Sequence, residues 1–467
     1  MPAQTSINPK IFKAYDIRAL YPQEINEEAA YKIAKAYATW LKPKKVALGY
    51  DVRTSSKPLF EEVKRGLTAM GVEVFDVGLI TSDMIVFATG NYNLDGGIVV
   101  TASHNPAEYN GMKLYRENAA PISIDSGLAE IRDIAMRHSE SGNRPDEKSK
   151  DPSADASRMT RKGKVTKLEI KEDYLKKVFS LVDTEEIKPM KVVVNPNFGA
   201  AGEMIEQIAQ KLNLELVKLN FESDGTFPKG QPDPSQLENQ KETGELARKS
   251  GAAFAAMWDA DADRCLFLDE NGEFVMGCYA TAILAEAMLD QHPKSKIVFD
   301  TTLIWPAIDR VKAAGGVPLV NKVGHSFITE RMIEEDAIFG GETSGHFYFK
   351  DLWFCDNGMV PFLLMLKKLS TSGKKMSDLA DYLRNKYPNG FKLIRKEEGI
   401  PEKLKEIEER YADAKIEHID GVSVEYPDWR FNARASNTEP LLKVFLEAKS
   451  QKLVDEKLKE VVDLIEN

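Results

Sequence analysis

Three carboxylates at alternate positions make the stretch FAAMWDADADRCLFLD a candidate metal site. Asp259, Asp261 and Asp263 follow a strongly apolar segment and are separated only by alanine. Side chains two residues apart in an extended chain point the same way, so the three carboxylates can converge. A hard divalent cation such as Mg²⁺, which prefers oxygen ligands, relieves their mutual repulsion. An EF-hand is disfavoured because Arg264 stands where that loop needs glycine. A solvated acidic turn is the alternative, and we favour the metal site.

A serine and a histidine stand side by side where a second apolar segment ends, in GGIVVTASHNP. The β-branched run Ile98–Val100 predicts a buried strand, and Ser103 and His104 follow it. Ligands bind at this end of the strands in open α/β sheets. The stretch lacks the GxSxG motif of α/β-hydrolases. Ser103 is therefore either a phosphoryl carrier or a helix cap, and we expect Lys113 on a neighbouring strand.

The glycine-rich loop FGGETSGHFYF offers groups that suit a sugar. Glu342 and Ser344 can exchange hydrogen bonds with neighbouring hydroxyls, and the imidazole of His346 suits proton transfer near neutral pH. A glycine-rich turn between two strands is the alternative.

The loop RASNTEP carries the donors of a phosphate site. Arg434 can make a bidentate, charge-assisted contact, and further donors come from Ser436, Asn437 and Thr438. The alternative is a polar turn that leads into the next strand.

Three similar passages supply elements that could position these loops. Residues 45–78, 191–219 and 296–324 each read as an apolar strand, a polar loop, an amphipathic helix and a second strand. This order is typical of βαβ units in a mostly parallel sheet. Residues 138–167 are polar and predict a linker or a long excursion. The tail after Tyr387 alternates a charged helix with strands and predicts a small α+β domain.

The fold class that follows is three related mixed α/β domains plus a smaller C-terminal α+β domain around a central cleft. We expect the boundaries at residues 1–158, 159–272, 273–384 and 385–467. One of the four loops then falls in each domain. Clefts between domains are common sites for small molecules.

Composition narrows the class of protein. The 467 residues carry a net charge of −10, which disfavours a general nucleic-acid binder. The three cysteines form no CxxC pair, which suits a reducing compartment without structural zinc. No apolar run reaches the ~18 residues of a membrane span. We expect a cytoplasmic protein with neither nucleic-acid nor membrane partners.

The order of the four loops resembles the α-D-phosphohexomutase superfamily, and within it the bacterial and archaeal phosphomannomutase/phosphoglucomutase group. Further matching stretches are FKAYDIR near the start, GYDVRTSS around Asp51 and Arg53, and DGTFPKGQPDP from Asp224. The resemblance covers nearly the whole chain.

This resemblance implies an enzyme that interconverts hexose 1-phosphate and hexose 6-phosphate of mannose and/or glucose. Ser103 would be the phosphorylated residue, and Mg²⁺ would be held by Asp259, Asp261, Asp263 and a phosphoserine oxygen. A hexose 1,6-bisphosphate would be both the intermediate and the activator. The partners would be small sugar phosphates, and the enzyme would be a monomer or a homodimer.

The resemblance also implies roles for residues of the other loops. Glu342 and Ser344 would bind sugar hydroxyls, and the phosphate that is not reacting would be bound by Arg434, Ser436, Asn437 and Thr438. Positions lining the family's cleft are matched by Tyr15, Arg18, Lys113, Arg264, Lys322, His325 and His346. The candidates for proton transfer or charge stabilisation are Arg18, His104, Lys113 and His346.

Some residues depart from the family pattern, and other functions stay open. Ala19 follows DIR where glycine is usual, and Thr343 occupies a variable place in the sugar loop. Asn437 and Thr343 weigh against phosphoglucosamine mutase, the nearest alternative. An aspartyl-phosphate phosphatase, with Asp259 as nucleophile and Asp261 as acid/base, is an alternative from another class. A sugar-phosphate sensor that binds without turnover is the third.

Overall fold

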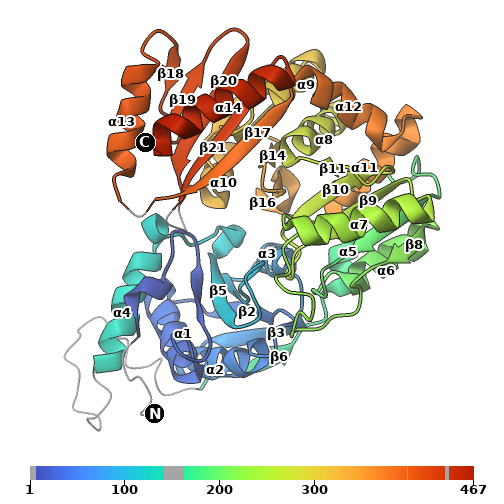
Figure 1. The fold of residues 1–467 in the computed structure, drawn as a ribbon. Helices are drawn as coiled ribbons and strands as arrows, with labels where there is room; N and C mark the ends of the chain where they lie inside the picture. The colour runs from blue at the N-terminus through green and yellow to red at the C-terminus, as the bar shows by residue number, and fades with distance from the viewer. Residues whose placement is uncertain (1–6, 141–161, 397, 437–440, 467) are drawn as a thin grey trace.

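Four β-sheets follow one another along the chain, with helices packed around them (Figure 1). The computed structural model describes residues 7–140, 162–396, 398–436 and 441–466. Within these residues the first sheet has six strands, in the order β1-β5-β4-β2-β3-β6, and the other three have five each. We call the four units domains I to IV. Three mixed α/β domains and a C-terminal antiparallel one confirm the predicted fold class.

Domain I holds the sheet nearest the N-terminus. Its strands are β1 (Ile17–Leu20), β2 (Lys45–Tyr50), β3 (Glu73–Leu79), β4 (Gly96–Val100), β5 (Tyr109–Arg116) and β6 (Val165–Lys167). Its helices are α1 (Glu27–Leu41), α2 (Ser56–Ala69), α3 (Ser82–Asn91) and α4 (Leu128–Glu140).

Domains II and III follow in the middle of the chain. The strands of domain II are β7 (Lys191–Asn195), β8 (Glu215–Lys218), β9 (Phe254–Trp258), β10 (Cys265–Asp269) and β11 (Phe274–Val275). Its helices are α5 (Lys171–Ser180), α6 (Gly202–Leu212) and α7 (Leu237–Ser250). The strands of domain III are β12 (Lys296–Asp300), β13 (Val317–Asn321), β14 (Phe339–Gly341), β15 (Phe347–Phe349) and β16 (Cys355–Asp356). Its helices are α8 (Gly277–Gln291), α9 (Trp305–Ala313), α10 (His325–Glu335), α11 (Met359–Ser372) and α12 (Met376–Lys386).

Domains I to III repeat one arrangement of four strands. A central strand pairs in parallel with two neighbours: β2 with β3 and β4, β7 with β8 and β9, and β12 with β13 and β14. The chain then turns back in an antiparallel hairpin, β4–β5, β9–β10 or β14–β15. The predicted βαβ repeats are confirmed. The turns of the three hairpins hold Ser103, the three aspartates and the Glu342 to His346 loop, so three of the predicted loops occupy equivalent places.

Domain IV is an antiparallel sheet covered on one face by helices. It consists of β17 (Asn389–Arg395), β18 (Lys415–Glu417), β19 (Val422–Glu425), β20 (Trp429–Ala435) and β21 (Leu441–Ala448), with α13 (Ile400–Arg410) and α14 (Gln451–Glu466). Alternation along β20 sends Trp429 and Phe431 into the apolar core and Arg430 to the opposite face, as the period of two requires. None of the described helices is long and apolar enough to cross a membrane.

The segment between domains I and II differs from the predicted linker. Helix α4 runs on to Glu140, and β6 pairs in parallel with β3 from Val165 to Lys167. These three residues complete the first sheet, although we place them in the second domain on sequence grounds. The unpaired edge of β3 offers backbone hydrogen bonds to any extended segment beside it, and a polar composition does not reveal such pairing. The expected boundary at residue 158 lies outside the described residues.

A buried carboxylate joins the first three domains. Asp83 of α3 accepts hydrogen bonds at 2.5 Å from the hydroxyl of Tyr174 in domain II and at 2.5 Å from the amide of Asn357 in domain III. Burial raises the pKa of Asp83 to about 6. One apolar cluster, which includes Phe87 and Phe362, continues through the same three domains. Domains I to III therefore share a core.

We expect Tyr174→Phe to lower the thermal unfolding midpoint, because it removes a donor from the buried Asp83 carboxylate. The expected cost is about 1–3 kcal/mol. Tyr92→Phe is the matched control, since the Tyr92 hydroxyl donates at 2.9 Å to an exposed Asp173. Circular dichroism melts of both variants test this. Equal midpoints for the two would contradict the role of the junction.

Candidate active site

The serine loop of domain I meets the aspartate loop of domain II. Ser103 Oγ donates a hydrogen bond to Asp259 Oδ2 at 2.7 Å, and His104 Nδ1 lies 3.1 Å from Ser103 Oγ. Ser103 is buried, with 1% of its surface exposed. Two of the four predicted loops are therefore in direct contact, and the serine hydroxyl faces the carboxylates.

Ser103 is held in an unusual backbone conformation. Its φ angle is 47°, in the left-handed region that costs an ordinary residue about 1–2 kcal/mol. The Thr101 hydroxyl accepts from its backbone N–H at 2.9 Å, and Arg53 donates to its carbonyl at 2.6 Å. Such strain persists only where neighbours hold it, and it aims the hydroxyl at the aspartates.

The three aspartates form a buried cluster. Their oxygens lie within 4.8 Å of one another. Lys113 Nζ on β5 donates to Asp261 at 2.7 Å and also to Asp263. Burial and the two neighbouring carboxylates raise the pKa of Asp259 well above its usual range. Against the effect of burial, Lys113 and His346 hold the pKa of Asp263 well below its usual range.

The cluster suits a divalent cation. Asp261 Oδ1 and Asp263 Oδ1 are buried and make no hydrogen bond to any described residue. Buried oxygens of this kind are costly unless something binds them. Three carboxylates around one point, two of them with an oxygen that accepts no hydrogen bond from a described residue, are the oxygen-rich ligand set that Mg²⁺ accepts.

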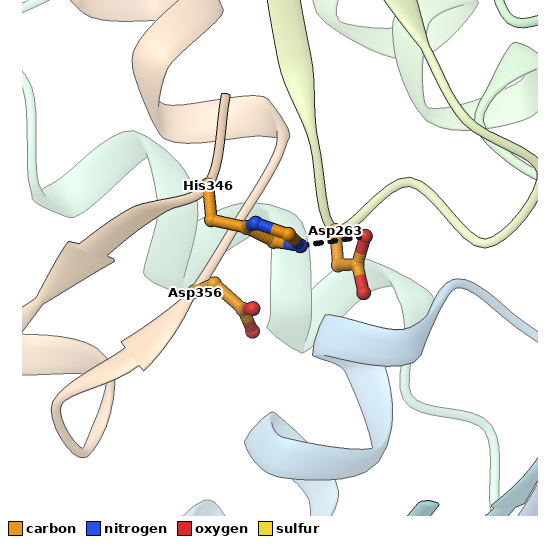
Figure 2. Close-up of side chains that lie close together, drawn as sticks. All are labelled: Asp263, His346 and Asp356. Atoms are coloured by element: carbon orange, nitrogen blue, oxygen red, sulfur yellow. Dashed lines mark ion pairs between the residues drawn. The ribbon is translucent and has the colours of Figure 1, made fainter. Parts of the chain in front are cut away.

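A second acidic group joins domain III to the cluster, as Figure 2 shows. His346 Nε2 lies 3.5 Å from Asp263 Oδ1, and Asp356 at the end of β16 completes the group. Against the effect of burial, Asp263 and Glu342 raise the pKa of His346 to about 10. The imidazole is therefore a cation at neutral pH. Sequence reasoning missed Asp356, a single aspartate that no motif marks.

Two arginines border the serine. Arg18 Nη1 donates to Asn105 Oδ1 at 2.6 Å, and Arg264 donates its backbone N–H to Asp259 at 3.2 Å. Burial, together with both guanidinium groups, lowers the pKa of His104 well below its usual range. His104 is therefore neutral beside a positively charged rim.

The predicted sugar-binding loop, Gly340 to His346, places Glu342 and Ser344 against His346. Glu342 accepts from the backbone of Gly324 at 2.7 Å and from the Tyr348 hydroxyl at 2.6 Å, and Ser344 Oγ lies 2.9 Å from His346 Nδ1. Although burial opposes it, His346 lowers the pKa of Glu342 to about 2, so this carboxylate is ionised.

Thr343, the variable position of that loop, is engaged elsewhere. Its backbone N–H donates to Asp300 at 2.5 Å, and its hydroxyl lies 2.8 Å from that of Thr302. The side chain is thus tied to the end of β12.

Three more of the predicted residues lie where domain I meets domain III. The ring of Tyr15 contacts that of His325 with centroids 4.9 Å apart, and its hydroxyl donates to the carbonyl of Val323 at 3.5 Å. Lys322 Nζ lies 5.4 Å from the ring of Phe327. Burial lowers the pKa of His325 to about 4, so its imidazole is neutral.

The loop of domain IV that we predict to bind phosphate reaches the same segment of domain III. Arg434 Nε donates to Asp420 at 2.7 Å, and Asp420 also accepts from the backbone of Val323 at 3.2 Å. Ser436 is half-buried at the end of the described part of the loop. Asn437 and Thr438 lie outside the described residues. Asp420 therefore links Arg434 to the segment of domain III that holds Lys322 and His325.

The comparisons with known proteins show that this chain is a phosphomutase, an isomerase that moves a phosphoryl group. The chain belongs to the phosphoglucomutase/phosphomannomutase family, as the sequence resemblance predicts. Residues 9–141, 172–272 and 277–387 match its alpha/beta/alpha domains I, II and III, and residues 391–464 match its C-terminal domain.

Relatives of known name are similar over nearly the whole chain. Phosphohexose mutases of Xanthomonas campestris are 39% identical over 457 residues, covering 97% of this chain and 98% of the relative. A phosphomannomutase of Escherichia coli is 39% identical over 463 residues, with 97% and 98% covered. The crystal structure of a phosphoglucomutase/phosphomannomutase family protein from Burkholderia thailandensis superposes with a TM-score of 0.82 at 27% identity, with 98% of each chain covered.

We expect Lys113→Met to make folding depend more strongly on Mg²⁺, because two buried carboxylates lose their cation. In EDTA the variant should be less stable by about 3–5 kcal/mol, and added Mg²⁺ should restore more stability than in the unchanged protein. Lys449→Met is the control, since Lys449 pairs with Asp428 at 2.8 Å on the surface. Thermal melts with and without Mg²⁺ test this. A variant that melts like the unchanged protein in EDTA would refute the neutralising role of Lys113.

Proposed function

We propose that this protein interconverts hexose 1-phosphate and hexose 6-phosphate, with Ser103 carrying the phosphoryl group. The observation that carries the proposal is the 2.7 Å contact between Ser103 Oγ and Asp259, inside a cluster that contains Lys113. Serine and aspartates come from different domains, so their meeting is a property of the assembled chain. Membership of the family favours a mutase over an aspartyl-phosphate phosphatase or a sensor that only binds.

Each half-reaction exchanges one oxygen–phosphorus bond for another. In the first, a sugar hydroxyl oxygen forms a bond to phosphorus and the bond from phosphorus to Ser103 Oγ breaks. The hydroxyl proton passes to a base, and the product is a hexose 1,6-bisphosphate. This molecule turns around, and Ser103 then takes the other phosphoryl group. The same bisphosphate, added in trace amounts, would phosphorylate Ser103 and so act as activator.

Residues around Ser103 have the chemistry that this exchange needs. His104 is within hydrogen-bond distance of Ser103 Oγ, at 3.1 Å, and is placed to hold the proton of that oxygen. Arg18, Lys113, Arg264 and His346 supply positive charge near the phosphoryl oxygens. Positioning and charge stabilisation account for most of the catalysis of phosphoryl transfer.

We assign Mg²⁺ to Asp259, Asp261 and Asp263, with a phosphoserine oxygen as a further ligand. The assignment is supported by Asp261 Oδ1 and Asp263 Oδ1, which are buried and accept no hydrogen bond from a described residue. The chemistry that a bound cation supplies here is neutralisation of charge on the phosphoryl group.

We assign the sugar ring to domain III and the phosphate that is not reacting to domain IV. Glu342 and Ser344 would bind ring hydroxyls, with Tyr15, Lys322 and His325 beside them. The phosphate that is not reacting would be bound by Arg434, Ser436, Asn437 and Thr438. The contact through Asp420 and Val323 supports a shared site for the two loops.

We propose mannose and glucose phosphates as the substrates, with glucosamine phosphate as the alternative. The names of the curated relatives favour mannose. Thr343 is tied to Asp300 and Thr302, so the sugar preference rests on other residues of the loop. We also propose a cytoplasmic enzyme, monomeric or homodimeric, which three buried free cysteines support.

Ser103→Ala should abolish mutase turnover, because no side-chain oxygen remains to carry the phosphoryl group. We expect a loss of at least ~10³-fold with the melting midpoint nearly unchanged. The assay presents mannose 1-phosphate, glucose 1-phosphate and glucosamine 1-phosphate separately, with Mg²⁺ and a trace of glucose 1,6-bisphosphate. Ser250→Ala, at the end of α7, is the control. Unchanged turnover by Ser103→Ala would refute the phosphoserine proposal, and conversion of glucosamine 1-phosphate alone would correct the sugar.

Arg434→Ala should raise KM more than it lowers kcat, because it removes a phosphate contact used in both orientations of the sugar. A charge-assisted hydrogen bond of this kind is worth about 10- to 100-fold in KM. Arg410→Ala on the exposed face of α13 serves as the control. An unchanged KM would remove Arg434 from the phosphate site.

A further inference from the structure

Domains I to III share one hydrogen-bonded turn, which lies at the end of the central strand of each sheet. A residue with a short polar side chain stands at the end of each central strand: Asp51 directly follows β2, and Asn195 and Asp300 are the last residues of β7 and β12. In each case a side-chain oxygen accepts the backbone N–H two residues further on. The distances are 3.0 Å to Arg53, 2.9 Å to Asn197 and 2.8 Å to Thr302. All six residues are at most 3% exposed.

The second residue of each turn reaches the functional loop of its own domain. Arg53 donates to the carbonyls of Ser103 and Asn105, both at 2.6 Å. Asn197 Nδ2 donates at 2.7 Å to the carbonyl of Trp258, the residue before Asp259.

In domain III the corresponding contact runs through hydroxyl groups. The Thr302 hydroxyl lies 2.8 Å from that of Thr343, between Glu342 and Ser344. Three different residue types thus make the same connection. The connection therefore belongs to the position in the repeat rather than to one side chain.

The sheet topology explains why this position is available. The strand with the turn lies beside the first strand of the functional hairpin in every domain, because β2 pairs with β4, β7 with β9 and β12 with β14. A side chain that leaves the turn meets the neighbouring loop at once. Additional contacts follow the same route: Ala200 donates to the carbonyl of Ala260 at 2.8 Å, and Asp300 accepts from Thr343.

The burial of these groups makes the connection rigid. A short side chain that accepts from the backbone two residues on fixes the turn locally. A buried donor or acceptor that loses its partner costs about 1–3 kcal/mol, so each loop has one strongly preferred position. In domains I and II these contacts hold backbone carbonyls and in domain III they hold the Thr343 hydroxyl, so the reactive side chains of the loops are not used.

We propose that Arg53, Asn197 and Thr302 are equivalent positioning residues, each setting the functional loop of its own domain. The assignment rests on the proposed function of those loops. It implies separable effects: Asn197 governs the metal site, and Thr302 governs the sugar site. The test uses these two because Arg53 also pairs with the buried Asp51, at 3.2 Å, and its loss would endanger folding.

Asn197→Gly tests the metal side. Glycine tolerates the positive φ of 49° and removes only the side-chain amide. The probe is Mn²⁺ alone, bound to the unphosphorylated full chain and followed by the electron paramagnetic resonance of the free ion. We expect Mn²⁺ to bind about 10-fold more weakly, with KM for the hexose phosphate within about 2-fold. Asn220→Gly is the matched control, since Asn220 has φ 47° and its amide nitrogen donates to no described residue.

Thr302→Val tests the sugar side with a side chain of the same shape. We expect KM for the hexose phosphate to rise about 10-fold, because the Glu342–Ser344 loop loses one tie, while Mn²⁺ affinity stays unchanged. Thr329→Val is the matched control. Thr329 is also buried in domain III and donates at 2.9 Å to a backbone carbonyl, that of Phe354, away from the loop.

The outcomes separate this inference from the function on which it rests. The positioning role is supported if Asn197→Gly weakens Mn²⁺ binding without changing KM and Thr302→Val raises KM without changing Mn²⁺ binding. Variants that change neither quantity, or change both together, overturn it. If the unchanged protein binds no Mn²⁺ or turns over no hexose phosphate, the proposed function fails instead.

Discussion

Three buried carboxylates at one point are the constraint around which the structure is arranged. Asp259, Asp261 and Asp263 repel one another, and no protein tolerates such charge without compensation. Arg264 of domain II lies close to Asp259 and Asp263, but the cations that form ion pairs with the aspartates among the described residues come from other domains. Lys113 comes from domain I and His346 from domain III, so the charge of domain II is balanced in part by the other two. The shared core and the Asp83 junction hold these domains together, and the electrostatic need is met only in the assembled chain.

The site is built from three domains because each of them contributes a loop from an equivalent hairpin. Each repeat presents a loop at the same edge of its sheet, and that loop holds a serine in domain I, a triple aspartate in domain II and a glutamate–serine–histidine set in domain III. Although the loops differ, the turn at the strand end is the same in all three domains, with Asp51, Asn195 and Asp300. The chemistry of the loops varies while the means of holding them does not.

Much of this could be predicted from the sequence, because the signals are local. Strand, loop and helix follow one another within about 30 residues, and each motif is contiguous, so periodicity and residue type identify both. The features that the sequence did not reveal depend on contacts between residues far apart in the chain. Asp356 matters only because β16 brings it to Asp263, and Tyr174 only because α5 packs on α3. Val165–Lys167 looked like linker because pairing with β3 uses backbone groups alone. Arg53 stood in a stretch matching the family, yet its four carbonyl contacts belong to the fold.

The ion pair between Arg434 and Asp420 has a consequence for selectivity. The guanidinium has a carboxylate partner of the protein's own, Asp420, at 2.7 Å from its Nε. In the proposed phosphate site, an anion that takes this Nε must displace the Asp420 carboxylate, so binding there is an exchange of one charged partner for another. A dianionic phosphate competes for the guanidinium better than a monoanion does, because its charge is larger. The same carboxylate is available to the guanidinium when the anion leaves.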